Sequence, residues 1–264
     1  MRLIWIGGNH PRHLCFAKGV EKEFGLAGAV IQERENFVPS PSLGLDPVDH
    51  NNFVRHFRNR ADAEAKYFGE WPYPDCPLLL VESETEVSSQ KAADFIKRCA
   101  PDLIFLFGPG LIKDPLYSQL PCPTVNLHLG LSPRYRGAAT LFWPFYFLEP
   151  AYAGSTLHFI VGEPDAGDIV HQSVPELDPN DHIHDVACKT ILASLEDALK
   201  MFDIYSRKRS WQTYKQKGTG KNFLTSDFRP EHLRVIYNLY DDDIAKQYLN
   251  GNIARKKPKL IRQC

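Results

Sequence analysis

The sequence predicts an α/β protein: a Rossmann-like, mostly parallel sheet with helices on both faces, followed by a short C-terminal appendage. Short, almost continuous apolar runs recur along the first half of the chain, such as Leu3–Ile6 and the run L-I-F-L-F that ends at Phe107. Strands that are buried on both faces have this composition, whereas half-exposed strands alternate. Glycine-bearing turns and helical segments separate the runs, which is the alternation of a parallel sheet.

The first unit is a strand at Leu3–Ile6, a loop over residues 7–13 and a helix that begins near Leu14. A strand, a glycine-bearing turn and a helix open many nucleotide-binding units, because backbone amides there can meet a phosphate. The full G-x-G-x-x-G pattern is absent, so a dinucleotide site is only weakly indicated. Gly8 and Asn9 of this loop are candidate substrate-binding residues. The alternative is that the loop only turns the chain.

A helical insertion at about 39–76 follows the second strand, Ala27–Gln32. Asp46 and Pro47 are a favourable N-cap and first helical residue, and Gly69 is placed to end the helix. Apolar residues recur between them at spacings of three to four: Phe53, Phe57, Ala61, Ala65 and Phe68. We expect a packed surface helix, the alternative being a flap that contributes to substrate recognition.

The elements that follow keep the same alternation. Ser83-x-x-Glu86 predicts a capping box at the start of a helix that ends near Cys99. Further strands are predicted at Pro77–Val81, Asp102–Phe107, Ser155–Val161, Ile169–Val174 and from Thr124 onward, and further helices at Thr140–Leu148 and Asp181–Ser206. Ligands of such sheets bind beyond the carboxyl ends of the strands, which here include the loops at 108–110 and at Gly130.

Residues 1–206 are predicted to form the catalytic domain, and 207–264 a C-terminal extension that serves dimerisation or contacts the substrate. Between Arg207 and Lys221 the chain is basic and has no acidic residue. Such a stretch is typical of a solvated linker, the alternative being contact with a phosphate-rich ligand. Helical pieces are expected near Glu231–Leu239 and Asp241–Leu249.

Composition excludes several classes of function. The 264 residues carry a formal net charge of −1, so no overall charge attracts the chain to nucleic acid or to an anionic membrane. The longest apolar run, Leu141–Leu148, is far shorter than the roughly 20 residues of a membrane span. The six cysteines show no Cys-x-x-Cys spacing, which argues against a zinc site. The N-terminus is not that of a signal peptide, and we expect a cytoplasmic protein without a metal.

Asn126 and His128 are the candidate catalytic pair. They interrupt the apolar strand that begins at Thr124, and residues two apart on a strand point to the same face. An amide can donate a hydrogen bond to a developing oxyanion, and an imidazole can move a proton near neutral pH. Asp165, in the acidic loop at 162–168, could orient the imidazole and accept a proton. No nucleophile elbow is evident, which favours direct transfer; a structural role for the pair is the alternative.

Two motifs resemble those of a known family. The run N-L-H-L-G-L-S-P-R-Y-R-G-A from Asn126 to Ala138, followed by G-E-P-D-A-G-D at 162–168, resembles the signature of the 10-formyltetrahydrofolate-dependent formyltransferases. This family includes glycinamide ribonucleotide transformylase, methionyl-tRNA formyltransferase and the nucleotide-sugar N-formyltransferases. The resemblance follows the order of elements from Leu3 to Ser206 and is most specific in residues 104–171.

The resemblance implies a co-substrate, 10-formyltetrahydrofolate, and roles for particular residues. Asn126, His128 and Asp165 occupy the places of the family's catalytic residues. A primary amine attacks the formyl carbon while Asn126 and a protonated His128 stabilise the oxyanion, and Asp165 keeps His128 charged and accepts the amine proton. Arg134 and Tyr135 are further candidates for substrate binding. Two loops resemble those of the folate pocket, with the residues Phe107, Gly108, Gly110, Leu111, Ile112, Gly162, Glu163 and Pro164.

The amine acceptor stays open at this point. A methionyl-tRNA enzyme needs a second, basic domain, and the short tail here carries the acidic run at 241–243, so tRNA is not expected. Pro11 makes the first loop unlike the phosphate loop of purine-pathway transformylases. We expect a nucleotide-linked amino sugar, formylated for a surface polysaccharide, and the tail is compatible with a homodimer. The alternatives are glycinamide ribonucleotide, another small amine such as a hydroxyornithine, and a non-catalytic protein that binds folate.

Overall fold

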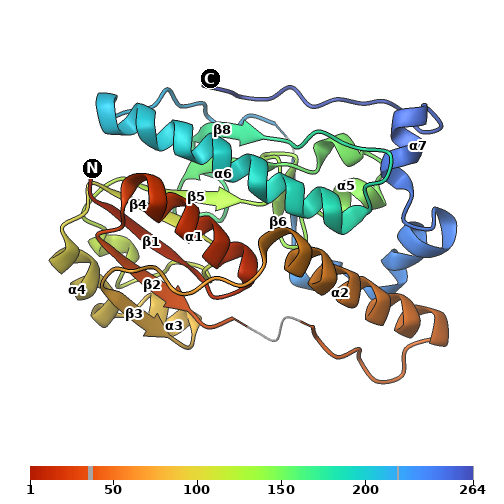
Figure 1. Ribbon diagram of the computed structural model, residues 1–264, viewed down its shortest axis with the longest axis horizontal. Coiled ribbons are helices and arrows are strands. Elements are labelled where there is room, and N and C mark those ends of the chain that lie inside the picture. Colours follow the sequence, from red (N-terminus) through yellow and green to blue (C-terminus); the bar gives the residue numbers. More distant parts are fainter. Residues whose placement is uncertain (35–37, 219, 264) are drawn as a thin grey trace.

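A seven-stranded sheet forms the centre of the molecule, with the strand order β3-β2-β1-β4-β5-β7-β8 (Figure 1). The computed structural model describes residues 1–34, 38–218 and 220–263. The strands β1 to β5 are parallel, whereas β7 and β8 are antiparallel to their neighbours. Their bounds are β1 Leu3–Gly8, β2 Gly28–Gln32, β3 Leu78–Val81, β4 Leu103–Phe107, β5 Thr124–His128, β7 Ser155–Phe159 and β8 Ile169–Ser173. The mostly parallel sheet predicted from the sequence is confirmed.

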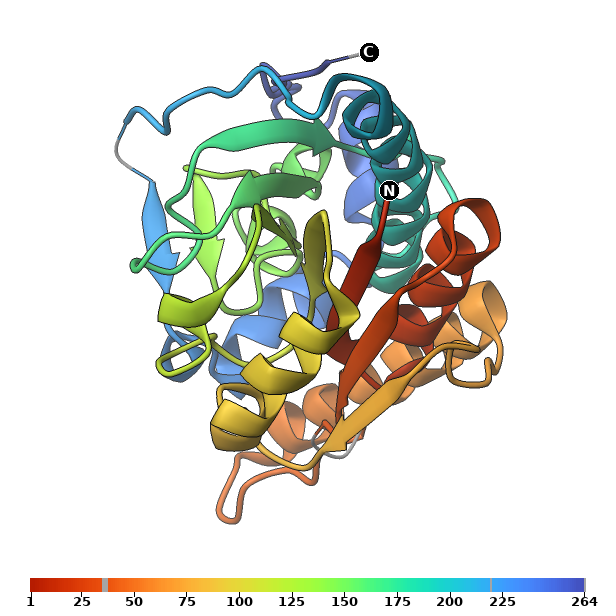
Figure 2. The same cartoon turned by 90° about the vertical axis from the view of Figure 1, so that its left-hand side faces the viewer.

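Alternate residues of the central strands feed a hydrophobic core on each face of the sheet. Trp5 and Phe105 are fully buried on the face that α1 (Pro11–Phe24) and α6 (Ile183–Lys208) cover. Their neighbours in the sequence, such as Ile104, lie on the opposite face against α4 (Gln90–Cys99). Figure 2 shows these helices on the two sides of the sheet. Because both faces are covered, the strands are apolar at every position rather than at every second one.

Two of the predicted helices differ from expectation at their ends. α1 begins at Pro11, before Leu14, because proline suits the first helical position, where no N–H is needed. The helix predicted from Ser83 to Cys99 is two helices, α3 (Glu84–Val87) and α4. Ser88 interrupts them: its backbone carbonyl accepts from Leu116 N at 3.2 Å and its hydroxyl from Lys113 N at 3.0 Å. The predicted cap is confirmed, since Ser83 Oγ accepts from Glu86 N at 3.2 Å.

Aromatic packing replaces regular helix in the region from Thr140 onward. The α-helix there is only α5, Trp143–Tyr146, and the Trp143 ring stacks on Phe223 with their centroids 4.6 Å apart. Phe223 ends β9, which pairs with β6 in a small parallel sheet that the sequence did not predict. The bounds are β6 Tyr135–Gly137 and β9 Lys221–Phe223, with short helical turns at Tyr117–Gln119, Pro150–Tyr152, Thr225–Asp227, Pro230–His232 and Val235–Leu239.

The insertion forms a single helix, α2 (Pro47–Phe68), whose N-cap is as predicted. Asp46 Oδ1 accepts from Val48 N at 2.9 Å. The buried face of α2 is largely polar, unlike that of a simple packed surface helix. Its buried residues include Asp49, Asn52, His56 and Glu64, which are 3–6% exposed. Asp49 is bound bidentately by Arg234 at 2.6 and 2.7 Å, and the Asn52 amide donates to Asn238 at 2.7 Å. The first half of α2 is thus fastened to the C-terminal segment.

The chain after Ser206 packs against the sheet and the helices rather than extending away from them. Trp211 is buried and donates from Nε1 to Met201 O at 2.8 Å, and Tyr214 pairs with Ile169 of β8. The apolar residues of the segment that holds α7 (Ile244–Asn250) share a core cluster with those of α5 and α6. The predicted boundary at 206 stays a prediction. No helix within the described ranges is long and apolar enough to cross a membrane.

The C-terminal residues complete the free edge of the sheet at β8, as the last part of the trace in Figure 1 shows. Gln172 N donates to Ile261 O at 2.7 Å, Ile261 N donates to the Gln172 side chain at 3.1 Å, and Gln263 Nε2 donates to Val170 O at 2.8 Å. These bonds satisfy backbone groups that an edge strand otherwise leaves to solvent.

Ending the chain at Lys257 is therefore expected to lower the free energy of unfolding by on the order of 2–3 kcal/mol, since each hydrogen bond contributes about 1 kcal/mol. Urea unfolding measures this. Arg262→Ala is the control, because it removes an exposed side chain and keeps the backbone. An unchanged urea midpoint in the shortened chain would show that the tail does not stabilise the sheet.

Candidate active site

A cavity of about 610 Å³ opens at the carboxyl ends of β4 and β5. Its lining includes the turn after β4, at 107–109, and the end of β5, at 126–129. This is the edge where parallel sheets bind ligands, and the volume is in the usual range of a small-molecule site. The cavity therefore lies where the sequence predicts the chemistry.

The three predicted catalytic residues meet at this cavity. His128 is 7% exposed, and its Nδ1 lies 3.3 Å from Asp165 Oδ2. Its Nε2 donates to the backbone carbonyl of Tyr135 at 2.9 Å, which places the proton of the neutral ring on Nε2. Asn126 lies two residues earlier on the same face of β5 and also lines the cavity. The residues are thus assembled as a site, with an amide beside an imidazole–carboxylate pair.

His158, which the sequence analysis did not single out, is a fourth member of the site. It lies on β7 directly opposite Asn126 and is 2% exposed. Its Nδ1 donates to Phe159 O at 2.9 Å, so its Nε2 can accept from Asn126 Nδ2 at 3.2 Å. That same Nε2 lies 3.5 Å from Asp165 Oδ1. The only signal in the sequence was a histidine within the otherwise apolar run at 157–161. The antiparallel register that places it opposite Asn126 is a tertiary property.

The loop of Asp165 is held in an unusual conformation. Asp165 has a φ of 52°, in the left-handed region that non-glycine residues seldom adopt. Gln216 Nε2 donates to Asp165 O at 2.7 Å and to Gly167 O at 2.8 Å, and Gly137 N donates to Asp165 Oδ2 at 3.1 Å. Gln216 belongs to the basic stretch between Arg207 and Lys221, which was expected to be a solvated linker. This stretch therefore holds the loop of Asp165 through a neutral side chain.

Burial and charge oppose each other in the His128–Asp165 pair. Burial lowers the pKa of His128, and this outweighs the opposite effect of the Asp165 carboxylate. Burial raises the pKa of Asp165, but His128 and His158 outweigh it and hold that pKa at about 2. Asp165 is therefore ionised and His128 neutral at pH 7. The expectation that Asp165 keeps His128 charged is corrected for this form of the protein, because desolvation of the imidazolium is the larger effect.

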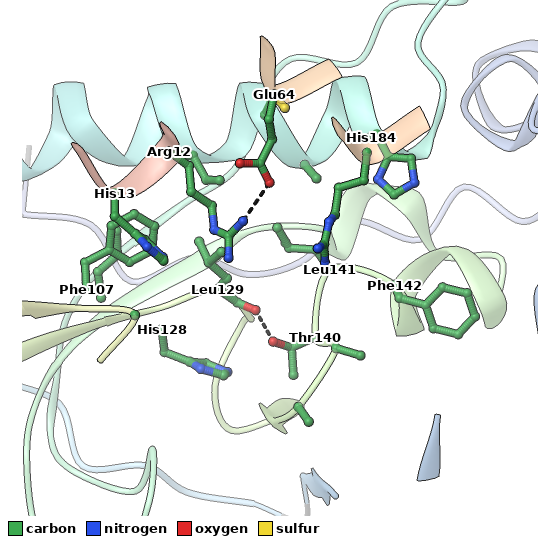
Figure 3. Close-up of a pocket in the computed structure, with 18 of the residues that line it drawn as sticks. Arg12, His13, Glu64, Phe107, His128, Leu129, Thr140, Leu141, Phe142 and His184 are labelled. Carbon is green, nitrogen blue, oxygen red and sulfur yellow. Dashed lines mark hydrogen bonds and ion pairs between the residues drawn. The ribbon is translucent and has the colours of Figure 1, made fainter. Parts of the chain in front are cut away.

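The opposite side of the cavity is polar and is built by α1, α2 and α6. Figure 3 shows Arg12, Glu64 and His184 on this side and His128 across the cavity from them. Arg12 is bonded to Glu64 Oε1 at 2.7 Å. His56 and Arg60 of α2 also line the cavity. The inserted helix is thus packed against its neighbours and at the same time forms a wall of the site.

Gly8 and Gly108 make room for a buried histidine. A Cβ atom at Gly8 would lie 2.4 Å from His13 Nδ1, and one at Gly108 would lie 2.2 Å from His13 Nε2. Gly108 also has a φ of 71°, which favours glycine. Gly8 therefore admits the imidazole of His13 into the cavity wall. Asn9 Oδ1 accepts from Arg34 N at 3.0 Å, which ties the first loop to the end of β2.

The structure does not bring Arg134 and Tyr135 to the cavity. Both side chains bind the buried carboxylate of Glu149, Arg134 at 2.6 and 2.9 Å and the Tyr135 hydroxyl at 3.0 Å. Lys256 of the C-terminal segment joins them at 3.0 Å. This cluster fixes the backbone of Tyr135, whose carbonyl orients His128. Arg134 and Tyr135 therefore affect the site indirectly, by fixing the carbonyl group that orients the His128 ring.

The predicted folate loops are only partly in the cavity lining. Phe107 and Gly108 line it. Gly110 N donates to the Gln32 side chain at 2.7 Å and Leu111 N to Glu84 at 2.9 Å, whereas Ile112 packs in the core near α4. Residues 162–164 are exposed. Their contact with folate stays a prediction. Among the residues that the structure describes, no cluster of three or more His, Cys, Asp or Glu is arranged to hold a metal ion.

Comparison with known proteins identifies the family. A family model described as formyl transferase matches residues 58–196, more than half of the chain. The chain therefore belongs to the formyl transferase family. It is an N-formyltransferase, as its motifs predicted. A similar protein, the methionyl-tRNA formyltransferase of Clostridioides difficile, is 22% identical over 283 residues, which cover 99% of this chain and 84% of that protein.

Solved structures share the fold. An N-formyltransferase from Helicobacter canadensis, solved with folinic acid and dTDP-3-aminofucose, has a TM-score of 0.53 and 16% identity over 98% of this chain and 84% of that one. A phosphoribosylglycinamide formyltransferase from Anaplasma phagocytophilum has a TM-score of 0.56 and 14% identity over 85% of this chain and 97% of that one. At these identities the likeness establishes the fold and leaves the acceptor to be inferred from the site.

The buried histidines predict a loss of stability in mild acid. Burial lowers the pKa of His13, His56 and His128, and it lowers the pKa of His184 to about 3. Below pH 6.5 these histidines become protonated in the unfolded chain but stay neutral in the folded chain. The free energy of unfolding is therefore highest above that pH and declines as the pH falls. We expect about 1.4 kcal/mol per pH unit from His184 between pH 6.5 and 4.

Melting temperatures between pH 8 and 4.5 measure this dependence. His184→Asn should flatten the acid side of the curve, whereas His50→Asn, which replaces an exposed histidine of α2, should leave it unchanged. A wild-type melting temperature that stays constant from pH 7 to 5 would contradict the lowered pKa values.

His158 is expected to position Asn126 and Asp165 without touching the reacting atoms. His158→Leu removes both contacts and should lower kcat for formyl transfer by about tenfold, the equivalent of one hydrogen bond, with a smaller change in KM. His158→Gln keeps a polar group in reach and should restore part of kcat. If both variants lose stability equally but turn over like the wild type, His158 is only a core residue.

Proposed function

We propose that this protein transfers the formyl group of 10-formyltetrahydrofolate to the amino group of a nucleotide-linked amino sugar. The observation that carries the proposal is the position of Asn126, His128 and Asp165 on one side of a cavity whose other side is polar. The first side has the groups that an acyl transfer needs. The second has groups that recognise a polar acceptor.

Asn126 is suited to stabilise the oxygen of the formyl group during transfer. Its Nδ2 carries two N–H groups, and one of them donates to His158 Nε2 at 3.2 Å. The other can donate to an oxygen that gains negative charge as the amine attacks the formyl carbon. Because the contact with His158 fixes the amide, little reorganisation is needed when the charge develops.

The His128–Asp165 pair is suited to accept the proton that the amine loses. The resting pair holds one negative charge and no proton on His128 Nδ1, which faces Asp165 Oδ2 at 3.3 Å. A proton delivered to the pair can be shared between these atoms in a buried site. As the tetrahedral intermediate collapses, the bond between the formyl carbon and N10 breaks, N10 takes up the proton, and the new amide and tetrahydrofolate are released. No covalent enzyme intermediate is required.

The nature of the acceptor is inferred from the polar wall. Arg12, Arg34 and Arg60 line the cavity together with several neutral histidines, and this suits an acceptor that carries hydroxyl groups and phosphates. The Helicobacter canadensis enzyme, solved with an amino sugar nucleotide, shares the fold. A role in surface polysaccharide synthesis in the cytoplasm would follow from this acceptor, and the C-terminal segment is compatible with a homodimer.

Two substitutions test the chemistry. Asn126→Ala removes the amide donor and His128→Ala breaks the proton-accepting pair. Asn126→Ala should lower kcat by a hundredfold or more, because the loss of one oxyanion donor typically costs about 2.7–4 kcal/mol. His128→Ala should lower kcat by about a hundredfold or more, because general acid–base catalysis typically contributes about 10²–10⁴-fold. Release of tetrahydrofolate measures the turnover, and circular dichroism shows that the variants fold. Near-normal turnover in both variants would refute the assignment.

A panel of acceptors tests the substrate. It contains dTDP-, UDP- and GDP-linked amino sugars, glycinamide ribonucleotide and methionyl-tRNA, the last because a methionyl-tRNA formyltransferase is a relative. We expect transfer to one of the amino sugars. Transfer only to methionyl-tRNA or to glycinamide ribonucleotide would replace the proposed acceptor, and folate binding without transfer to any member would favour a non-catalytic role.

A further inference from the structure

The inserted helix α2 presents a row of polar side chains to the cavity. His56, Arg60 and Glu64 are spaced by four residues, so they lie on one face of the helix. All three line the cavity, across from His128. A helix that serves only to cover a core presents apolar residues on its inner face. Contacts within the protein account for part of this row, since His56 Nδ1 lies 3.0 Å from the Tyr237 hydroxyl and Glu64 Oε1 is bonded to Arg12 at 2.7 Å. They leave Glu64 Oε2 for a ligand.

Within residues 1–34, 38–218 and 220–263, three buried polar atoms around this face have no hydrogen-bond partner. They are Glu64 Oε2, His13 Nδ1 and His184 Nε2, which belong to α2, α1 and α6. Their side chains belong to residues that are only 4%, 2% and 6% exposed, and all three line the same cavity. A buried polar atom without a partner costs roughly 1–3 kcal/mol. Three such atoms around one cavity indicate groups of a bound molecule that complete their hydrogen bonds.

The chemistry of the three atoms identifies the groups that fit them. A carboxylate oxygen can only accept a hydrogen bond, so Glu64 Oε2 requires a donor. Neutral imidazole nitrogens either donate or accept, according to the tautomer. A hydroxyl group both donates and accepts and therefore satisfies all three atoms, whereas a phosphate or carboxylate of the ligand would be repelled by Glu64.

We infer that α2 builds a subsite for the sugar ring of the acceptor, in which Glu64 Oε2 accepts a hydrogen bond from a ring hydroxyl and His13 and His184 bind further hydroxyls. This inference rests on the proposed function and adds the residues that recognise the acceptor. Arg12 holds Glu64 through Oε1 at 2.7 Å, and Oε2 has no hydrogen-bond partner among the described residues. Phe57 and Phe142 also line the cavity and offer apolar surface to the C–H groups of a ring.

Binding without the formyl donor tests the subsite directly. Calorimetry compares each nucleoside diphosphate (dTDP, UDP and GDP) with its amino-sugar conjugate, so the difference reports the sugar alone. In the wild type one conjugate should bind at least tenfold more tightly than its nucleotide. Glu64→Gln turns the free acceptor into a donor and His184→Asn shortens the second partner. Glu64→Gln should reduce this gain by roughly tenfold to a hundredfold, because hydrogen bonds to charged groups are strong. His184→Asn should reduce it by roughly fivefold, because the imidazole of His184 is neutral and its hydrogen bond is weaker.

Asp62→Asn is the matched control, since it removes the charge of an exposed carboxylate on α2, two residues before Glu64. It should retain the gain that the sugar provides. Circular dichroism establishes that each variant folds, and the use of two variants keeps the test valid if one of them does not. With the acceptor that the panel identifies, Glu64→Gln should raise KM by a similar factor and change kcat little.

The outcomes separate the subsite from the proposed function. If no sugar adds affinity in the wild type, or if the gain persists in both Glu64→Gln and His184→Asn, the subsite is refuted. If the sugar adds affinity through Glu64 but no formyl group is transferred, the subsite stands and the proposed function falls. Transfer to an amino sugar that is unaffected by either variant refutes the subsite and leaves the function intact.

Discussion

The largely buried carboxylate of Asp165, whose side chain is 15% exposed, is the group around which the site is arranged. It lies 3.3 Å from His128 Nδ1, 3.5 Å from His158 Nε2 and 3.1 Å from Gly137 N. These contacts outweigh the cost of desolvation and hold its pKa at about 2. A charge in this position is stable only with such partners around it. The loop has to place the carboxylate next to these partners. The positive φ of Asp165 and the hydrogen bond from Gln216 to its carbonyl hold the loop in that conformation.

Supports for this arrangement come from distant parts of the chain. Glu149 binds Arg134, Tyr135 and Lys256, and so fixes the carbonyl of Tyr135 that accepts from His128. Burial raises the pKa of Glu149, but the three donors outweigh this and lower it overall. Lys256 belongs to the C-terminal segment, which also pairs with β8. The tail is therefore connected, through Glu149 and Tyr135, with the position of the His128 imidazole in the candidate site.

Helix α2 divides its polar face between two tasks. Its first half, with Asp49 and Asn52, is bonded to Arg234 and Asn238 and fastens the helix to the tail. Its second half, with Arg60 and Glu64, lines the cavity. The polar residues of α2 recur at the same spacing of three to four residues as its apolar residues. The sequence analysis predicted the helix from the apolar residues Phe53, Phe57 and Phe68. Periodicity located the helix correctly but did not reveal which face was buried.

The sequence by itself determined the parallel sheet and the position of α2, and it predicted Asn126, His128 and Asp165 as the candidate site residues that line one cavity. Continuous apolar strands, an N-cap with proline and a local motif are properties of neighbouring residues, and they can be read without coordinates. Only the tertiary structure decided that His158 and Gln216 join the site, that Arg134 and Tyr135 turn to Glu149, and that His128 is neutral. These depend on strand register, on contacts between distant segments and on desolvation, and none of the three is a local property of the chain.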